Sequence, residues 1–414
     1  MRPHILVIHR TRGPAVPYLD HIDHDMKAVT YICAENARDR VPVRAAAEVV
    51  TFQTEEGVPI AARELTNRHG LPERIVALDE LDLLTAAALR EIYDIDGDRL
   101  DHVLPFRDKL LMYTSVAGTG IAVPAFSAAP DPAAVLEFGA RHSFPLIVKP
   151  RLGATSRDIR TLWSPEDVAE LPDLDAEPFL VQQFCPGEIA SINGVWTGSD
   201  LGPWRAARSF HTLLGFADSE RSWGTVDIDD TELNVRLADF AHSVLATLSR
   251  SVPTVFHLEL FLDPAGAPDL QLLEIACRIP EAETTHLWSE VYRYDLVGAA
   301  LDIQLGYSPD ASPLPVAHVA GQLLVRPAAR PPCAVTAVHF EVAPEHEPYH
   351  SMIPRVGELI TEQTGYAGVG ASFRFCGRSS AQVFAALRAT LAGFDLECTA
   401  AAPTVNSGER VRSQ

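Results

Sequence analysis

The stretch FHLELFLDPAGAPDLQLLEIACRIP, residues 256–280, carries two glutamates inside runs that otherwise consist mainly of apolar residues. Glu259 lies in the first run and Glu274 in the second, and the segment DPAGAPD between them is rich in residues typical of turns. This pattern predicts two antiparallel strands joined by a turn. Because the turn is centred midway between the two glutamates, they should lie nearly opposite each other on neighbouring strands.

The alternation of side chains along a strand assigns each glutamate to one face of this hairpin. In the first strand His257 shares the face of Glu259. In the second strand the same alternation places Leu272 and Ala276 on the face of Glu274. The prediction is therefore a sheet with an acidic patch on one face, while the opposite face is mainly apolar and includes Gln271.

Two carboxylates at directly opposed positions, with Cβ atoms about 5 Å apart, repel each other unless they share a proton or a cation. Oxygen ligands suit a hard cation, and Mg²⁺ (or Mn²⁺ in its place), completed by phosphate and water, fits a site with few protein carboxylates. The sequence thus predicts Glu259 and Glu274 as metal ligands. The alternative is an exposed sheet face on which both acids are solvated.

Composition restricts the class of protein. The chain has 414 residues, 47% of them hydrophobic, which is enough for two or three globular domains. A net charge of −21 argues against nucleic acid and anionic membranes as partners. The six cysteines form no CxxC pair, and the chain begins without the apolar run of a signal peptide. We expect a reduced, cytoplasmic protein.

Lysine is rare in this chain. Of 34 basic residues only Lys27, Lys109 and Lys149 are lysines, so arginine is the default cation. A lysine that persists in such a chain indicates a position where the broad guanidinium does not fit. Lys149 interrupts the apolar strand LIVKP, which favours a functional role, whereas Lys27 and Lys109 alone could be surface residues.

The first hundred residues alternate strands with helices, which predicts an open, parallel α/β sheet. The expected strands are 4–9, 28–33, 47–52 and 74–79, and the expected helices are 57–70 and 80–95. No GxGxxG follows the first strand, so a dinucleotide site is not expected.

The remainder of the chain is predicted to contain further α/β segments. Helices are expected from 108, at 131–142, from 164 and at about 231–249, and strands at 145–150, 158–163, 179–184 and 189–196. A polar middle separates the last strand from the helix near 231. The Pro-rich passage 307–315 leads to a mixed α/β module, and the tail 399–414 is expected to be disordered.

Five segments of this chain resemble the ATP-grasp carboxylate–amine ligases, which include L-amino-acid ligases and carnosine synthase, and they follow one another in the family's order. The hairpin FHLELFL…LLEIACRIP is similar to their metal-binding strand pair, FPLIVKPRLGATSRD to their strand–lysine–loop element and FLVQQFCPGEIASING to their hinge strand. The segments around FRDKLLMYTSVAGTGIAVPAF and GYAGVGASFRFCGRSSAQVFAALRA resemble the entry to the nucleotide-binding region and the end of the C-terminal lobe. The resemblance covers most of the chain.

This resemblance implies an ATP-grasp fold with four structured parts and a tail. They are an N-terminal Rossmann-like domain (1–107), a small lid domain (108–185), a central antiparallel-sheet domain (186–310), a C-terminal lobe (311–398) and the tail (399–414). The implied cofactors are ATP and Mg²⁺. The resemblance also implies small-molecule carboxylate and amine substrates, most often amino acids, and allows a homodimer.

The resemblance assigns roles to individual residues. ATP binding is implied for Lys109, Lys149, Gly153, Ser156, Gln182, Gln183, Phe184 and Glu188. The family's ribose-binding glutamate often stands one position later than Glu188, where this chain has Ile189. Arg278 shares the strand face of Glu274 and is implied to bind the transferred phosphoryl group, with His257 facing the same site.

The chain departs from the family next to the metal site. Many relatives have Asn where this chain has Ala276, and a glycine pair where it has the segment containing Glu281 and Glu283. These two glutamates could pair with a substrate ammonium or belong to a charged surface loop. Further candidates for substrate binding are Arg205, Arg208, His211 and Trp223.

The reaction implied by the resemblance is the formation of an amide, commonly a dipeptide, through an acyl phosphate. Two alternatives remain open. One is a different ATP-grasp reaction, that of a carboxylase or a small-molecule kinase. The other is an ATP-binding subunit without catalytic activity.

Overall fold

The computed structural model describes the chain except for residues 1, 11–12, 14, 155–156, 213–214, 217–220, 263–269, 316–317, 362–367 and 402–414. The chain forms two compact units. One consists of Met1–Ser209 with Val226–Val319, and the other of Phe210–Thr225 with the chain from Ala320 onward. The finer division into four parts and a tail stays a prediction.

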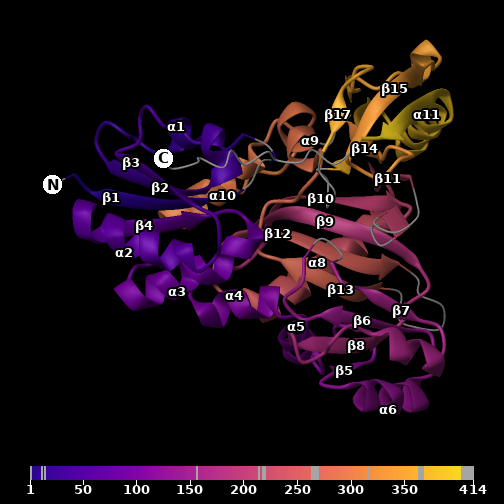
Figure 1. The fold of residues 1–414 in the computed structure, drawn as a ribbon, viewed down its shortest axis with the longest axis horizontal. Coiled ribbons are helices and arrows are strands. Elements are labelled where there is room, and N and C mark those ends of the chain that lie inside the picture. Colours follow the sequence, from indigo (N-terminus) through magenta and orange to yellow (C-terminus); the bar gives the residue numbers. More distant parts are fainter. Residues whose placement is uncertain are drawn as a thin grey trace, which may run out of the picture. The chain divides into compact units, whose positions relative to one another are not determined.

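The first sheet consists of four parallel strands, so the predicted open parallel sheet is confirmed (Figure 1). Its strand order is β3-β2-β1-β4. The bounds are β1 His4–His9, β2 Ala28–Ala34, β3 Glu48–Phe52 and β4 Pro72–Ala77, with helices α1 Tyr18–His21, α2 Gly57–His69 and α3 Leu83–Tyr93. The 3-10 helices η1 Glu35–Arg40 and η2 Glu80–Asp82 follow β2 and β4. The carboxyl ends of parallel strands are where functional side chains gather, and η2 begins there.

Two short helices connect this sheet to the next, where the sequence predicted one. They are α4 Leu100–Arg107, which was not predicted, and α5 Lys109–Val116. Asp108 separates them, because its backbone is extended and its side chain accepts hydrogen bonds from the amides of Leu110 and Leu111 as the N-cap of α5. The cap therefore places Arg107 and Lys109 at the junction of two helices.

A second sheet has four antiparallel strands in the order β5-β8-β6-β7. Its elements are β5 Phe126–Ala128, α6 Pro132–His142, β6 Leu146–Pro150, β7 Arg160–Leu162, η3 Pro165–Glu170 and β8 Phe179–Gln183. Asp131 caps α6, since its side chain accepts from the amide of Ala134. The helix predicted from 164 is instead the 3-10 helix η3, whose N-terminus is capped by a capping box between Ser164 and Asp167.

The third part of this unit is an antiparallel sheet in the order β13-β12-β9-β10. Its strands are β9 Glu188–Trp196, β10 Leu201–Phe210, β12 Thr254–Leu262 and β13 Leu270–Ala276, and its helices are α8 Thr231–Leu248, α9 Thr284–Glu290 and α10 Leu296–Leu305. The polar middle contains strand β10, which the sequence did not predict. One face of the sheet packs with α8 in a core that contains Ile192, Leu245 and Leu258.

The second unit confirms the predicted mixed α/β module. It contains a row of strands β11, β14, β18 and β16, and a three-stranded sheet in the order β17-β15-β19. The bounds are β11 Ser222–Asp227, β14 Val319–Val325, β15 Cys333–Phe340, η4 Pro344–His346, β16 His350–Met352, β17 Leu359–Ile360, β18 Ala371–Gly377, α11 Ser380–Gly393 and β19 Phe394–Ala400. Strand β19 thus extends two residues into the tail predicted to begin at 399, and residues 402–414 lie outside the described chain.

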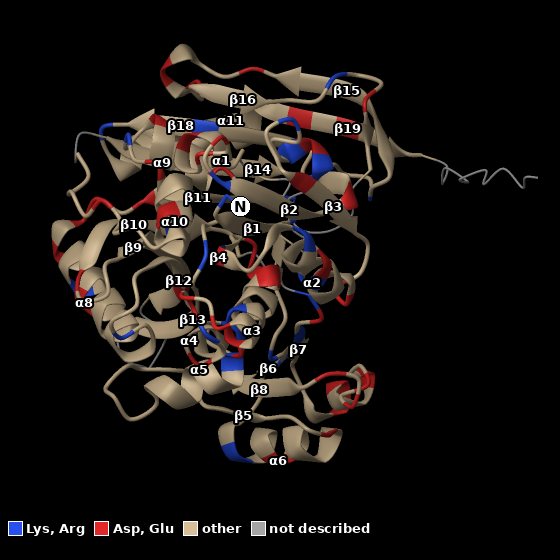
Figure 2. Ribbon diagram, turned by 90° about the vertical axis from the view of Figure 1, so that its left-hand side faces the viewer, with Lys and Arg blue, Asp and Glu red and all other residues tan. Residues whose placement is uncertain are grey.

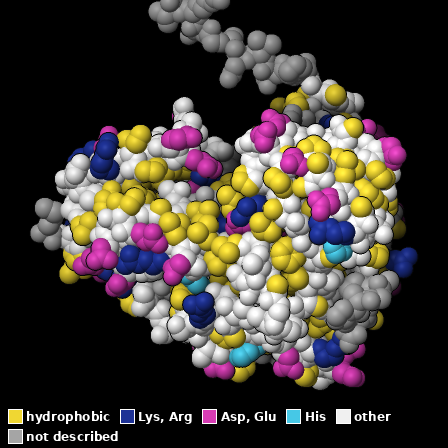
Figure 3. Space-filling model, turned by 90° about the horizontal axis from the view of Figure 1, so that it is seen from below, with side chains coloured by type: hydrophobic (Ala, Val, Ile, Leu, Met, Phe, Trp, Pro, Cys, Tyr) yellow, Lys and Arg dark blue, Asp and Glu magenta, His cyan; other side chains and the backbone are white. Residues whose placement is uncertain are grey.

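None of the helices in the described residues has the length and apolar character needed to cross a bilayer. On the face drawn in Figure 3, the described Lys and Arg side chains are scattered among acidic and hydrophobic ones. That face therefore does not present the continuous basic patch that nucleic acid requires.

Candidate functional site

The two glutamates of the hairpin are directly opposed. Glu259 on β12 pairs with Glu274 on β13, so the register predicted from the turn is confirmed. Glu259 is 8% exposed, and the side chain of Glu274 is 35% exposed. The alternative of two solvated acids on an open sheet face does not fit the burial of Glu259.

A β-bulge next to this pair corrects one part of the predicted strand faces. The register shifts after Glu259, so that Leu260 pairs with Leu272 and Leu273 is the extra residue. Leu272 is fully buried in the apolar core, opposite to the prediction that it shares the face of Glu274. The bulge restores a continuous apolar face while it leaves both carboxylates on the other face.

The charges around the pair differ for its two members. Burial, together with the charge of Glu274, raises the pKa of Glu259. Burial alone would also raise the pKa of Glu274, but Lys109 and Lys149 hold it below its usual range. The Nζ atom of Lys109 lies 3.3 Å from Oε2 of Glu274. In the described structure one carboxylate is thus stabilised as an anion and the other favours its protonated form.

Polar side chains of β9 extend the acidic face. Ser191 pairs with Glu259 and Asn193 pairs with His257 across the sheet. His257 Nδ1 lies 2.7 Å from Asn193 Oδ1, which requires the ring to donate at Nδ1. Burial, and then the charge of Arg278, lower the pKa of His257 to about 3, so this ring is neutral near pH 7. Ser191 and Asn193 were not predicted, although their alternation with apolar residues in IASIN was a usable signal.

Lys149 lies in β6 and is 3% exposed. Burial lowers its pKa to about 8 even though the charge of Glu274 acts in the opposite direction. Its Nζ lies 5.6 Å from the centre of the Tyr113 ring, a cation–π contact. The Tyr113 hydroxyl donates to the bulge carbonyl of Leu273 at 2.7 Å and contacts Gln182 Oε1 at 3.1 Å. Tyr113, which the sequence analysis missed, therefore connects three strands of the site.

The loop after Lys149 is attached to the α4–α5 junction. Lys109 Nζ donates to the carbonyl of Gly153 at 2.7 Å, and the Lys109 amide donates to the carbonyl of Arg151 at 3.0 Å. Arg151 Nε donates to Asp108 Oδ1 at 2.9 Å. Lys109 and Lys149 therefore approach the carboxylates from two different elements. Ser156, which was predicted to bind phosphate, lies outside the described residues.

Arg278 follows β13 and is held by a carboxylate that the sequence analysis missed. Glu80 Oε2 accepts from Arg278 Nε at 2.8 Å, and Glu80 Oε1 accepts from Arg107 Nη1. Arg278 Nη2 lies 3.7 Å from Oε1 of Glu281, whose pKa is raised by burial. Figure 2 shows acidic and basic positions together around α4, α5 and β13. Glu80 could have been suspected from its place directly after a parallel strand.

The described residues contain no group of three or more His, Cys, Asp or Glu side chains placed to hold a metal ion together. Glu259 and Glu274 are the carboxylates that could do so as a pair. Their direct opposition and the raised pKa of Glu259 fit a bridging cation, provided that the remaining ligands come from outside the protein.

No protein-family model and no curated protein sequence matches this chain. Solved structures do. The L-amino acid ligase from Bacillus licheniformis aligns with 97% of this chain and 99% of its own, at a TM-score of 0.72 and 15% identity. This chain has the ATP-grasp fold.

Other enzymes share this fold over nearly their whole length. The biotin carboxylase domain of 2-oxoglutarate carboxylase from Hydrogenobacter thermophilus, solved with MgADP, ADP and bicarbonate, covers 95% of this chain and 90% of its own, with a TM-score of 0.66 and 13% identity. Phosphoribosylglycinamide synthetase from Anaerococcus prevotii covers 96% and 99%, with a TM-score of 0.64 and 10% identity. At these identities the similarity concerns the ATP-grasp fold itself, which confirms the predicted fold class.

Strand β8 and the residue that follows it contain three of the predicted ATP-binding residues. Gln182 is 2% exposed, and its side chain meets Tyr113 as described above. The amide of Gln183 donates to the carbonyl of Ala125, and the amide of Phe184 donates to the carbonyl of Pro145. These two amides thus fix the strand end to its own sheet, and their role toward a nucleotide stays a prediction.

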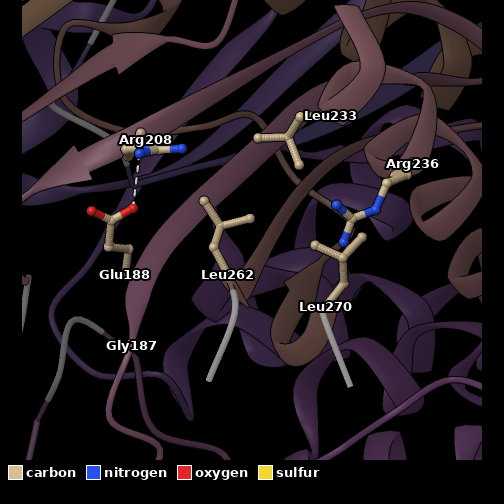
Figure 4. A pocket seen from close by; sticks show the side chains of 7 residues that line it. All are labelled: Gly187, Glu188, Arg208, Leu233, Arg236, Leu262 and Leu270. Carbon is tan, nitrogen blue, oxygen red and sulfur yellow. Dashed lines mark ion pairs between the residues drawn. The ribbon is translucent and has the colours of Figure 1, made fainter. Parts of the chain in front are cut away.

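Glu188 lies apart from the other predicted ATP-binding residues. It pairs with Leu262 across the sheet, and therefore shares the face of α8, opposite to that of Glu259. Its carboxylate lies 2.9 Å from Arg208, which had been predicted to bind substrate. Both line a cavity of about 340 Å³ on that face (Figure 4), together with Gly187, Leu233, Arg236, Leu262 and Leu270.

The remaining substrate candidates are dispersed. Arg205 lies over the Tyr292 ring, with 4.7 Å from its Cζ to the ring centre, and Glu283 occupies the N-cap position of α9. His211 and Trp223 belong to the second unit, where Trp223 is buried. Among the six candidates, Glu281 contacts Arg278.

Proposed function

We propose that this protein is an ATP-dependent carboxylate–amine ligase that forms an amide through an acyl phosphate. The observation that carries the proposal is the directly opposed pair Glu259 and Glu274, which lies within reach of Lys109 and Lys149 in an ATP-grasp fold. Acidic ligands beside buried cations suit a nucleotide triphosphate with its metal.

In this proposal Glu259 and Glu274 hold Mg²⁺, which neutralises charge on the phosphates when it is bound. Lys149 and Lys109 face the phosphates, and the loop that begins at Arg151 lies against them. A carboxylate oxygen of the first substrate attacks the γ-phosphorus, and the bond to the leaving ADP breaks. The nitrogen of the second substrate then attacks the acyl carbon, loses a proton and expels phosphate.

Arg278 supplies the charge that matters most during transfer. A planar guanidinium can bind two oxygens of a phosphoryl group at once, and such contacts strengthen as negative charge develops. By resemblance the substrates are amino acids and the product is a dipeptide. Glu281, beside Arg278, is the candidate for binding a substrate ammonium.

The test is an assay of ADP and phosphate release over pairs of amino acids, with mass spectrometry of the products. Release that requires two substrates and yields an amide supports the ligase. Release with bicarbonate, or with one substrate that becomes stably phosphorylated, supports a carboxylase or a kinase. Binding of ATP without release supports a subunit that lacks activity. Glu274→Gln should lose the activity, and Glu232→Gln on the exposed side of α8 is the matched control.

A further inference from the structure

Glu80 begins η2, which follows strand β4 of the parallel sheet, and its carboxylate reaches the site from outside the hairpin. Its side chain is 12% exposed and lies between Arg107 and Arg278. We propose that Glu80 is a positioning residue: it fixes the Arg278 guanidinium beside Glu259 and Glu274 and holds it off those carboxylates. The inference rests on the proposed function.

The hydrogen bonds of Arg278 define the plane of its guanidinium. Nε donates to Glu80 at 2.8 Å, and Nη1 donates to the carbonyl of Ile279 at 2.9 Å. Its contact with Glu281 is longer, at 3.7 Å between Nη2 and Oε1. A guanidinium held by hydrogen bonds at both Nε and Nη1 cannot rotate freely about its side-chain torsions, so its orientation is set before any ligand binds.

Glu80 also competes with the metal-binding pair for Arg278. The charge of Arg278 acts on both Glu259 and Glu274, which lie close enough to influence one another. If Glu80 were neutral, these carboxylates and Glu281 would be among the anions that attract the guanidinium. Arg278 would then move toward the position that the proposed cation needs.

The second arginine of Glu80 links the same carboxylate to the loop after β6. Arg107 is 4% exposed, and its Nη2 donates to the carbonyl of Leu152 at 3.0 Å. The neighbouring carbonyl of Gly153 accepts from Lys109. One buried acid therefore sets the position of both Arg278 and, through Arg107, the start of the proposed phosphate loop.

The main test is Glu80→Gln, which keeps the shape of the side chain and removes its charge. We expect kcat to fall about 10–100-fold, because a small displacement of a group that acts on the transition state slows a reaction by about that factor. KM for ATP should change less than about threefold. Asp79→Asn is the matched control, since it removes one acidic charge at the adjacent position. Asp79 caps η2 by accepting from the amide of Leu81, and Asn caps equally well, so this variant should keep wild-type kcat.

A double-mutant cycle with Arg278→Lys separates positioning from a merely structural role. If Glu80 acts through Arg278, the double variant should lose little more kcat than Arg278→Lys alone. Losses that multiply, or a Glu80→Gln variant with wild-type kcat, would overturn the proposal. Glu80→Asp, which keeps the charge, should recover part of the lost rate, and a rate no better than that of Glu80→Gln would count against it.

Thermal unfolding with and without Mg-ATP shows that each variant is folded and binds nucleotide. If Glu80→Gln does not fold, Glu80→Asp serves in its place, with reduced kcat and an unchanged ATP-dependent shift expected. Wild-type protein that releases no ADP with any substrate pair would refute the ligase. Wild-type turnover that is unaffected by Glu80→Gln would refute only the positioning role.

Discussion

Replacing Lys149 by Met should make the ligand-free protein more stable and abolish its ATP turnover. Lys149 is 3% exposed, and burial lowers the pKa of its ammonium to about 8. Met has a similar unbranched shape and no charge, so it can fill the same space in β6. The variant loses the cation that we propose for phosphate binding.

The magnitude follows from the pKa. A change from 10.5 to about 8 corresponds to about 3 kcal/mol of cost for the charged form, at about 1.4 kcal/mol for each pKa unit. This cost is a net value that already includes the cation–π contact with Tyr113. We therefore expect Lys149→Met to raise the free energy of unfolding at pH 7 by up to about 3 kcal/mol.

The sign of the pH dependence gives an independent check. Between pH 8 and 10.5 the unfolded chain binds a proton at Lys149 that the folded chain has released, so wild-type stability rises with pH in that window. Below pH 8 both states carry the charge and the cost is present in full. The advantage of Lys149→Met should therefore shrink as the pH rises from 8 to 10.5.

Urea unfolding at pH 7 and pH 10, without nucleotide, measures both quantities. Lys27→Met is the control, because Lys27 is partly exposed and its ion pair with Glu73 is long, with 3.9 Å between Nζ and Oε2. Its replacement should change the free energy of unfolding by less than about 0.5 kcal/mol. A Lys149→Met protein that is less stable than wild type at pH 7 would refute the reasoning. So would an advantage that does not depend on pH.

Other substitutions test the rest of the site. Glu259→Gln should stabilise the metal-free protein increasingly as the pH rises above 4.5, because the raised pKa of Glu259 makes wild-type stability fall there, whereas Glu274→Gln should not have this effect in urea unfolding. Both variants should lose most of the Mg-ATP turnover, measured as ADP release. Arg278→Lys should reduce kcat about 10²–10³-fold while ATP affinity from calorimetry changes little; equal losses in both would make it a ground-state anchor. Since the pKa of His257 is about 3, the free energy of unfolding of the wild type should rise with pH between about 3 and 6.5 more steeply than that of His257→Gln. If urea unfolding gives the same dependence on pH for both proteins, His257 is not held neutral in the folded state.

The sequence predicted those parts of the structure that depend on local patterns. The residues of the 263–269 turn lie outside the described chain, yet the symmetry of Glu259 and Glu274 about it was enough to predict their register. The alternation of strands and helices likewise predicted the parallel sheet, because βαβ units impose that order. In both cases the signal lies within a few residues of the feature that it predicts.

The bulge at Leu273 has no such signal, and the position of Glu80 after a parallel strand does not reveal its two arginine partners. An extra residue in a strand leaves the composition of that strand unchanged, so Leu273 looks like any other apolar residue in QLLEIA. Glu80 meets Arg107 and Arg278 across 27 and 198 residues of sequence. Contacts of this kind depend on how the sheets are packed, which local periodicity does not determine.

The electrostatics of the site favour a functional rather than a structural cluster. In a cluster that served only to stabilise the fold, burial would be compensated by the partners within it. Here burial keeps the pKa of Lys149 low and that of Glu259 high, so both charged forms are disfavoured in the ligand-free chain. Methionine in place of Lys149 and glutamine in place of Glu259 would remove these costs. The chain nevertheless has a lysine in β6, and lysine is rare in a chain whose basic residues are almost all arginine. An anionic ligand and a cation that bind together would satisfy both groups at once, which is the arrangement that Mg-ATP would bring to this site.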